Sequence, residues 1–320
     1  MKVLKLLIKA GVSAALIAIV IKAFDVRGVG AYIRQVDAQT MIVVVVIALL
    51  IALLHTARWI AVIRAAKGPA IGFGEALRLV LIGHFFNQAL PSSIGGDAVR
   101  IWCAWRAGVG FATAANTVIV DRAMTLLSLL LLAAAGLPGL FAIVVDPLAR
   151  WALSAVVVAG VCGYGAFLAL TRLPQFMTRW RVVRALLALA ALARAATLKP
   201  VYAAPIIGLS VLSFVGFSFI VYALARAMHL DVNLGDCILL VPPVILVTVV
   251  PVSIAGWGVR EGAMVVAFGF IQVPASAAFA MSVLFGVTLA IASLPGCVLW
   301  WLSGYQIRNV ATESDHAAAN

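Results

Sequence analysis

The sequence predicts an all-α, polytopic integral membrane protein. Of its 320 residues, 65% are hydrophobic and only 11% are charged, whereas soluble domains are about half apolar and a quarter charged. The apolar runs are too long for the strands of a membrane barrel, so we expect helices. We predict about six full spans plus two re-entrant helical hairpins that form an inverted repeat, or eight hydrophobic segments if each hairpin is counted as a span.

The net charge of +12 does not indicate a nucleic-acid partner. Because the chain has only 11 acidic residues, its excess Lys and Arg residues fit cytoplasmic loops that face anionic lipid. The cysteines are scattered singly in or near apolar segments, a spacing that suggests neither a metal site nor a disulfide framework. We therefore interpret them as small buried hydrophobic residues and expect no cofactor. These cysteines are Cys103, Cys162, Cys237 and Cys297.

One motif occurs twice, 160 residues apart. Residues 90–100 read LPSSIGGDAVR and residues 250–260 read VPVSIAGWGVR, so six of eleven positions are identical. In each copy an apolar run is followed by Pro, Ser and small residues and then by a charged segment; the second copy adds Glu261. Paired hydrophobic segments interrupted by Gly and Pro are the best sequence indication of a transporter's binding site.

Hydropathy divides the remaining chain into spans. Lys2, Lys5 and Lys9 precede an apolar run that ends near Phe24 and lacks a small-residue cleavage site, so we expect an uncleaved first span with its N-terminus inside. Residues 25–40 are expected to form a mixed outer loop. The further spans are predicted at about 41–63, 115–143, 151–170, 204–227 and 276–302, and the two hairpins at 73–106 and 236–272.

The basic segment 171–199 sets the orientation. It contains six Lys and Arg residues and no acid, which is the strongest cytoplasmic marker in the chain; residues 186–196 within it resemble an amphipathic interfacial helix. Counting spans from this segment, the first hairpin enters from the cytoplasm and the second from outside, and both termini are cytoplasmic. We predict a single transmembrane domain over residues 1–305, with repeat halves at about 41–143 and 204–302, and a disordered polar tail over 306–320.

The motif has the chemistry of an anion site. Pro91 lacks a backbone N–H, and Gly95 and Gly96 allow conformations that other residues avoid. A helix that restarts near Asp97 would point free N–H groups at the tip, beside the hydroxyls of Ser92 and Ser93. Non-helical backbone at membrane depth has to be covered by protein or water, so we expect the tips to meet around an internal, partly hydrated cavity.

Charged residues near the motif have two interpretations. Arg100 and Arg260 are related by the repeat, and each is expected to reach a phosphate in bidentate fashion. Ionisable groups at membrane depth are usually functional and paired; alternatively, the acids and arginines form closed salt networks that only fix the hairpins. Arg58 is interpreted as snorkelling to the inner interface, with substrate binding as the alternative. The candidate substrate-binding residues are Arg58, Asn87, Ser92, Ser93, Gly95, Gly96, Asp97, Arg100, Asp121, Arg122, Ser253, Gly256, Arg260 and Glu261.

These residues carry a resemblance to a known family. FFNQALP at 85–91, Gly95-Gly96-Asp97 with Arg100, Asp121-Arg122, and Pro251 with GWGVRE at 256–261 resemble the flippase-like transmembrane domain of the lysylphosphatidylglycerol synthases. The resemblance covers about residues 5–305 and implies translocation of lipid between leaflets of a bacterial or archaeal cytoplasmic (inner) membrane. The family that it resembles includes stand-alone members, some of which are associated with hopanoid lipids or with polyprenyl-linked sugars. The synthases' soluble lysyl-transfer domain has no counterpart in this sequence, so we do not expect that activity.

The leading hypothesis is therefore a lipid flippase rather than an enzyme. A lipid with a phosphate-bearing head group would enter the polar cavity and be bound by Arg100 and Arg260 alternately, and membrane lipids would be the partners. The chain has no P-loop, so it is not expected to use ATP directly. The alternatives are a scaffold or accessory subunit of a lipid-modifying pathway, as a homo-oligomer or with an enzyme partner, and an intramembrane hydrolase that uses His84, a tip serine and Asp97.

Overall fold

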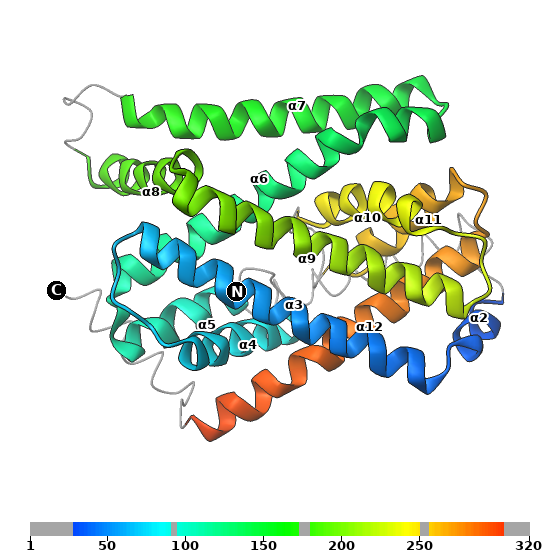
Figure 1. Ribbon diagram of the computed structural model, residues 1–320, viewed down its shortest axis with the longest axis horizontal. Coiled ribbons are helices and arrows are strands. Elements are labelled where there is room, and N and C mark those ends of the chain that lie inside the picture. The colour runs from blue at the N-terminus through cyan, green and yellow to red at the C-terminus, as the bar shows by residue number, and fades with distance from the viewer. Residues whose placement is uncertain (1–27, 91–94, 173–179, 250–255, 304–320) are drawn as a thin grey trace, which may run out of the picture.

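The computed structural model describes residues 28–90, 95–172, 180–249 and 256–303. All regular elements in these ranges are helices, as the composition predicted (Figure 1). The helices are α2 (Val29–Gln35), α3 (Ala38–Ala65), α4 (Phe73–Ala89), α5 (Gly95–Ala104), η1 (Trp105–Val109), α6 (Phe111–Ile143), α7 (Pro147–Ala169), η2 (Leu170–Arg172), α8 (Arg181–Leu198), α9 (Pro200–Ala227), α10 (Leu234–Thr248), α11 (Val259–Gly269) and α12 (Ala275–Leu302).

Five helices are long and apolar enough to span a membrane: α3, α6, α7 with η2, α9 and α12. The 28 residues of α3 rise about 42 Å, more than the roughly 30 Å of a hydrocarbon core. These helices confirm the five spans predicted after the first, and each begins one to four residues earlier than hydropathy placed it. The first predicted span lies outside the described residues.

Two pairs of shorter helices lie where the sequence predicted hairpins. The first hairpin is α4 and α5, and the second is α10 and α11. Each of these helices has fewer than the roughly 20 residues that a span requires; α4, with 17 residues, rises only about 25 Å. In Figure 1 the first hairpin starts at the end of the bundle that carries α8, and the second starts at the opposite end, where α2 lies.

Corresponding helices of the two halves make corresponding contacts. The helix α4 packs against α12, and its counterpart α10 packs against α6; likewise α5 packs on α6, and α11 on α12. The first helices of the halves, α3 and α9, lie side by side along the bundle (Figure 1). The charged residues of both copies, Asp97, Arg100, Arg260 and Glu261, are therefore buried inside one helical bundle.

Small residues allow the first hairpin to pack closely. A Cβ on Gly96 would collide with the carbonyl oxygen of Gly83, and a Cβ on Gly296 would collide with that of Leu81. Glycine at these positions lets α5 and α12 approach the α4 backbone, which is how helices commonly associate inside membranes.

The outer loop predicted over 25–40 is in part helical, so that expectation was wrong for α2. Gly28 begins this helix with a φ of 87°, in the left-handed region. Val29, Tyr32 and Ile33 then pack against the core formed mainly by α9–α12. This apolar packing explains why a seven-residue segment adopts helix although it is too short to be stable alone.

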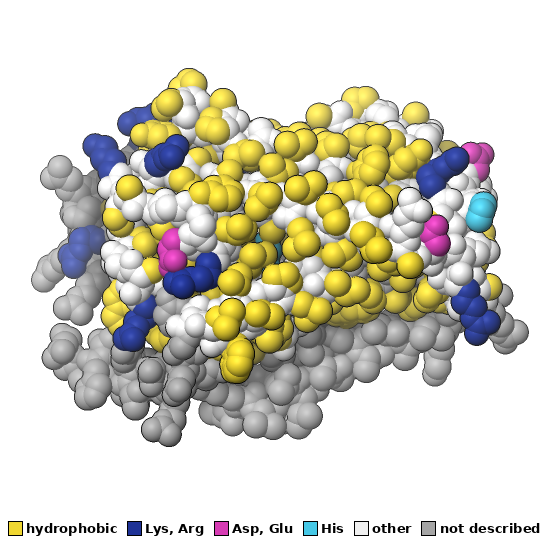
Figure 2. Space-filling model, turned by 60° about the horizontal axis from the view of Figure 1, so that its bottom comes forward, with side chains coloured by type: hydrophobic (Ala, Val, Ile, Leu, Met, Phe, Trp, Pro, Cys, Tyr) yellow, Lys and Arg dark blue, Asp and Glu magenta, His cyan; other side chains and the backbone are white. Residues whose placement is uncertain are grey.

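The surface has an apolar belt between two charged ends (Figure 2). The end that carries the C-terminus of α3 and the start of α4 is strongly basic, and the opposite end has mixed charge. The basic end carries Arg64, Lys67, Arg78, Arg106, Arg172, Arg184, Arg194 and Lys199, with the acid Glu75, and the mixed end carries Arg34, Arg150 and Arg226 with Asp37, Asp146, Asp231 and Asp236.

Candidate functional site

Five charged side chains form one connected cluster, named here the arginine cluster. Arg58 donates to both carboxylate oxygens of Asp121, from Nε at 2.8 Å and from Nη2 at 3.4 Å. Arg100 Nη2 donates to the same carboxylate at 3.2 Å and lies 4.0 Å from Asp97. Arg122 donates to both oxygens of Asp97, at 2.7 and 2.9 Å. The cluster thus connects α3, the first hairpin and α6.

Helix geometry explains how these residues meet. Asp97 and Arg100 are three residues apart on α5 and therefore share a face. Asp121 and Arg122 are adjacent on α6, so their side chains diverge by about 100°. Consequently Asp121 points toward Arg58 and Arg100 in the interior, whereas Arg122 reaches Asp97 from the side and remains 49% exposed.

The described cluster has three positive and two negative side chains, a surplus of one positive charge. Arg100 is the least satisfied member: its side chain is 6% exposed, and its Nε has no hydrogen-bond partner in the described part of the chain. Its guanidinium carbon lies 4.9 Å from the ring centroid of Trp59, in a cation–π contact. A buried surplus charge costs several kcal/mol unless it is compensated, so the site is suited to an anion.

Two histidines and a serine adjoin the cluster. His55 Nδ1 and His84 Nε2 are 3.4 Å apart, a hydrogen bond between α3 and α4. Ser210 on α9 accepts from Arg58 Nη1 at 3.4 Å. Neither His55 nor Ser210 was predicted to belong to the site. The only sequence signal for His55 is its position three residues before Arg58, on the same face of the helix.

The second copy of the motif forms a smaller and closed group, named here the Arg260 site. Arg260 donates to Glu261 at 2.7 Å and to the hydroxyl of Ser282 at 3.1 Å, and Ser282 donates to Glu261 at 3.1 Å. The Arg260 guanidinium also lies against the rings of Trp257 and Phe285, 4.8 and 5.8 Å from their centroids. One positive charge here faces one negative charge, and both are buried.

Two glycines contact the charged groups of the Arg260 site closely. The second carboxylate oxygen of Glu261 accepts from the N–H of Gly258, the residue that precedes α11. Gly286 on α12 faces the Arg260 guanidinium so closely that a Cβ would overlap it. The arginines that the repeat relates therefore differ: Arg260 is neutralised by its neighbour Glu261, whereas Arg100 shares Asp121 with Arg58.

The predicted tip residues have mixed outcomes. Gly95 and Gly96 form the start of α5, so the helix begins two residues before the restart that was predicted near Asp97. The N–H of Gly96 is bonded to Asn87 Oδ1 at 3.0 Å and so is not free for an anion. Gly256 lies in a turn with a φ of 80°. The predicted hydroxyl donors Ser92, Ser93 and Ser253 lie outside the described residues.

The interpretation of Arg58 as a snorkelling residue was wrong. Its side chain is 5% exposed and forms an ion pair with Asp121, 63 positions further along the chain. The closed-network alternative for Asp97, Arg100, Asp121 and Arg122 described the contacts of these residues, but it omitted Arg58 and with it the surplus charge.

The chain was compared with known proteins. A search of curated protein sequences finds no match. A family model, the lysylphosphatidylglycerol synthase TM region, matches residues 6–296, a range that includes both hairpins and both charged groups. The chain therefore belongs to the family of the lysylphosphatidylglycerol synthase transmembrane region, which indicates a function related to membrane lipids.

Proposed function

We propose that this protein is a lipid flippase that moves a lipid with a phosphate-bearing head group between the leaflets of the bilayer. The observation that carries the proposal is the surplus charge of the arginine cluster, with a partly unpaired Arg100 and a half-exposed Arg122. A phosphate placed between these two guanidiniums would neutralise the surplus, and guanidinium is the group that best binds phosphate in bidentate fashion.

Orientation follows from the charge of the two ends. Lys and Arg are enriched in the cytoplasmic loops of membrane proteins, so the basic end is proposed to face the cytoplasm of a bacterial or archaeal cell, with both termini on that side. The first hairpin then enters from the cytoplasm and the second from outside, each as a re-entrant segment. Inverted repeats of this kind support alternating access around a central site.

The Arg260 site has a different proposed role in this cycle. Its guanidinium is neutralised by Glu261 and enclosed by Ser282 and Gly286. Because the two halves are related by inversion, the opposite state is proposed to open this site and close the arginine cluster. Binding would then alternate between Arg100 and Arg260.

Two alternatives differ in what they require. A scaffold for a lipid-modifying enzyme requires no free cation, and the closed Arg260 site favours it. An intramembrane hydrolase would require Asp97 to orient His84, but Asp97 is bonded to Arg122 and His84 to His55. We therefore propose that the protein is not an enzyme.

Leaflet transfer of labelled anionic lipids in reconstituted liposomes tests the proposal. Wild type should transfer a phosphate-bearing lipid, and Arg100→Ala and Arg122→Gln should each reduce the rate at least tenfold. Arg78→Gln is the matched control, because it also removes an arginine from an ion pair, with Glu75, but at the surface. Well-folded wild type that transfers no lipid would support the scaffold, and equal transfer by all variants would remove the arginine cluster from the mechanism.

A further inference from the structure

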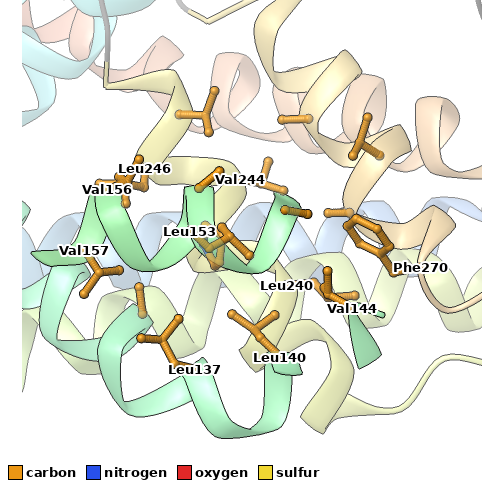
Figure 3. A pocket seen from close by; sticks show the side chains of 18 of the residues that line it. Leu137, Leu140, Val144, Leu153, Val156, Val157, Leu240, Val244, Leu246 and Phe270 are labelled. Atoms are coloured by element: carbon orange, nitrogen blue, oxygen red, sulfur yellow. The ribbon is translucent and has the colours of Figure 1, made fainter. Parts of the chain in front are cut away.

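An apolar crevice lies between the second hairpin and the helices α6 and α7 (Figure 3). Its volume is about 440 Å³, within the roughly 300–1,000 Å³ of ligand pockets. The lining side chains are all Ala, Leu, Val, Pro or Phe, together with one Gly. We propose that this crevice is a binding site for a single hydrocarbon chain of a membrane lipid.

The position of the crevice matches one leaflet of the bilayer. On α11 it extends from Val259, the residue before Arg260, to Phe270 at the end of the hairpin. Eleven helical rises give a length of about 16 Å, which is close to half of the roughly 30 Å hydrocarbon core. The crevice therefore runs from mid-membrane depth toward the mixed-charge end, as the tail of a lipid in that leaflet does.

The length and the lining of the crevice suit a hydrocarbon chain. The crevice is about 16 Å long, and the side chains that line it are apolar. An extended alkyl chain is thin and flexible enough to fill such a space.

The crevice is open to the bilayer. Val156 on α7 and Val266 on α11 line it and are 52% and 50% exposed. Both lie in helices of the apolar belt, where the surrounding solvent is lipid rather than water. Apolar cavities also stay dry, which leaves hydrocarbon as the occupant that the surroundings supply.

The crevice and the Arg260 site lie on different faces of α11. Val259, Ala263 and Val266 of α11 face the crevice, whereas Arg260 and Glu261 are buried and do not line it. Chain binding is therefore a separate property of the fold and does not require the transport that is proposed above. A hydrocarbon chain in the crevice would pack against the face of α11 that does not carry the Arg260 site.

Photocrosslinking in vesicles tests the proposal. The probe is diacylglycerol with a diazirine in one acyl chain, because its head group has no phosphate for the arginine cluster to bind. Wild type should concentrate the label on the facing sides of α7, α10 and α11. Ala152→Phe and Ala263→Phe, which fill the crevice from opposite walls, should reduce that labelling at least threefold.

Ala155→Phe is the matched control. Ala155 is an exposed residue on the same helix as Ala152 but does not line the crevice, so its replacement should leave the labelling unchanged. Labelling spread evenly over the outside of α7, or unaffected by either filling variant, would overturn the proposal, as would crosslinks between two copies of the chain through these residues. Arg100→Ala should retain the labelling even where transport is lost, which separates this result from the proposed function.

Discussion

Replacement of Asp121 by Asn should be among the most destabilising single changes in the protein. Its carboxylate is 2% exposed and accepts hydrogen bonds from both Arg58 and Arg100. Asparagine keeps the shape but removes the charge, so the surplus in the arginine cluster rises from one positive charge to two. Removing one partner of a buried ion pair costs about 3–5 kcal/mol, and we expect the free energy of unfolding to fall by about that amount.

The assay is unfolding in detergent micelles by titration with dodecyl sulfate, followed by circular dichroism. Glu75→Gln is the control, because it breaks an ion pair with Arg78 in which both side chains are 34% exposed; such pairs contribute about 0–1 kcal/mol. The double variant Arg58→Gln, Asp121→Asn restores the surplus to one charge and should recover part of the loss. An Asp121→Asn protein as stable as Glu75→Gln, or a double variant less stable than the single one, would refute the reasoning.

Three further predictions concern the hairpins. Gly286→Ala should displace the Arg260 guanidinium and lower the free energy of unfolding by about 1–3 kcal/mol, as overpacking does. Gly163→Ala, which meets nothing within 4 Å, should leave the free energy of unfolding unchanged or raise it by up to about 1 kcal/mol in the same titration, because alanine favours helix over glycine. Glu261→Leu should lower the free energy of unfolding by about 3–5 kcal/mol. Adding Arg260→Leu should recover most of this loss, because apolar replacement of a whole buried pair is often tolerated. A double variant no more stable than Glu261→Leu would contradict this prediction. Asn87→Ala removes the acceptor for the Gly96 N–H in the first turn of α5 and should lower the free energy of unfolding by about 1 kcal/mol. The Gly96 amide should then exchange its hydrogen faster. Unchanged exchange would show that the bond is not formed.

Hydropathy and internal repetition were sufficient to predict the helical class and to place the long apolar helices of the described residues. Each span beyond the first, and both hairpins, could be placed from the sequence because a helix that crosses a bilayer needs a fixed length of apolar residues. The short helix α2 was missed because its stability comes from packing against other helices rather than from its own pattern.

The charged site was only partly predictable. Arg100 and Asp121 were identified because charge at membrane depth is rare. The pairing of Arg58 with Asp121 could not be predicted, because it joins two helices whose relative rotation no local sequence pattern encodes. For the same reason the sequence implied two equivalent arginines, whereas tertiary packing gives Arg260 a carboxylate of its own, Glu261, and leaves Arg100 Nε without a partner in the described residues.

The two ion pairs between α5 and α6 have opposite polarity. In the first pair, α5 supplies the acid Asp97 and α6 supplies the base Arg122. In the second pair, α5 supplies the base Arg100 and α6 supplies the acid Asp121. If α5 slid along α6 by one helical turn, Arg100 would replace Asp97 opposite Arg122, and two like charges would meet. Only one register of the two helices is therefore electrostatically favourable, so the hairpin either moves together with α6 as a rigid unit or separates from it completely, and a gradual sliding motion is disfavoured.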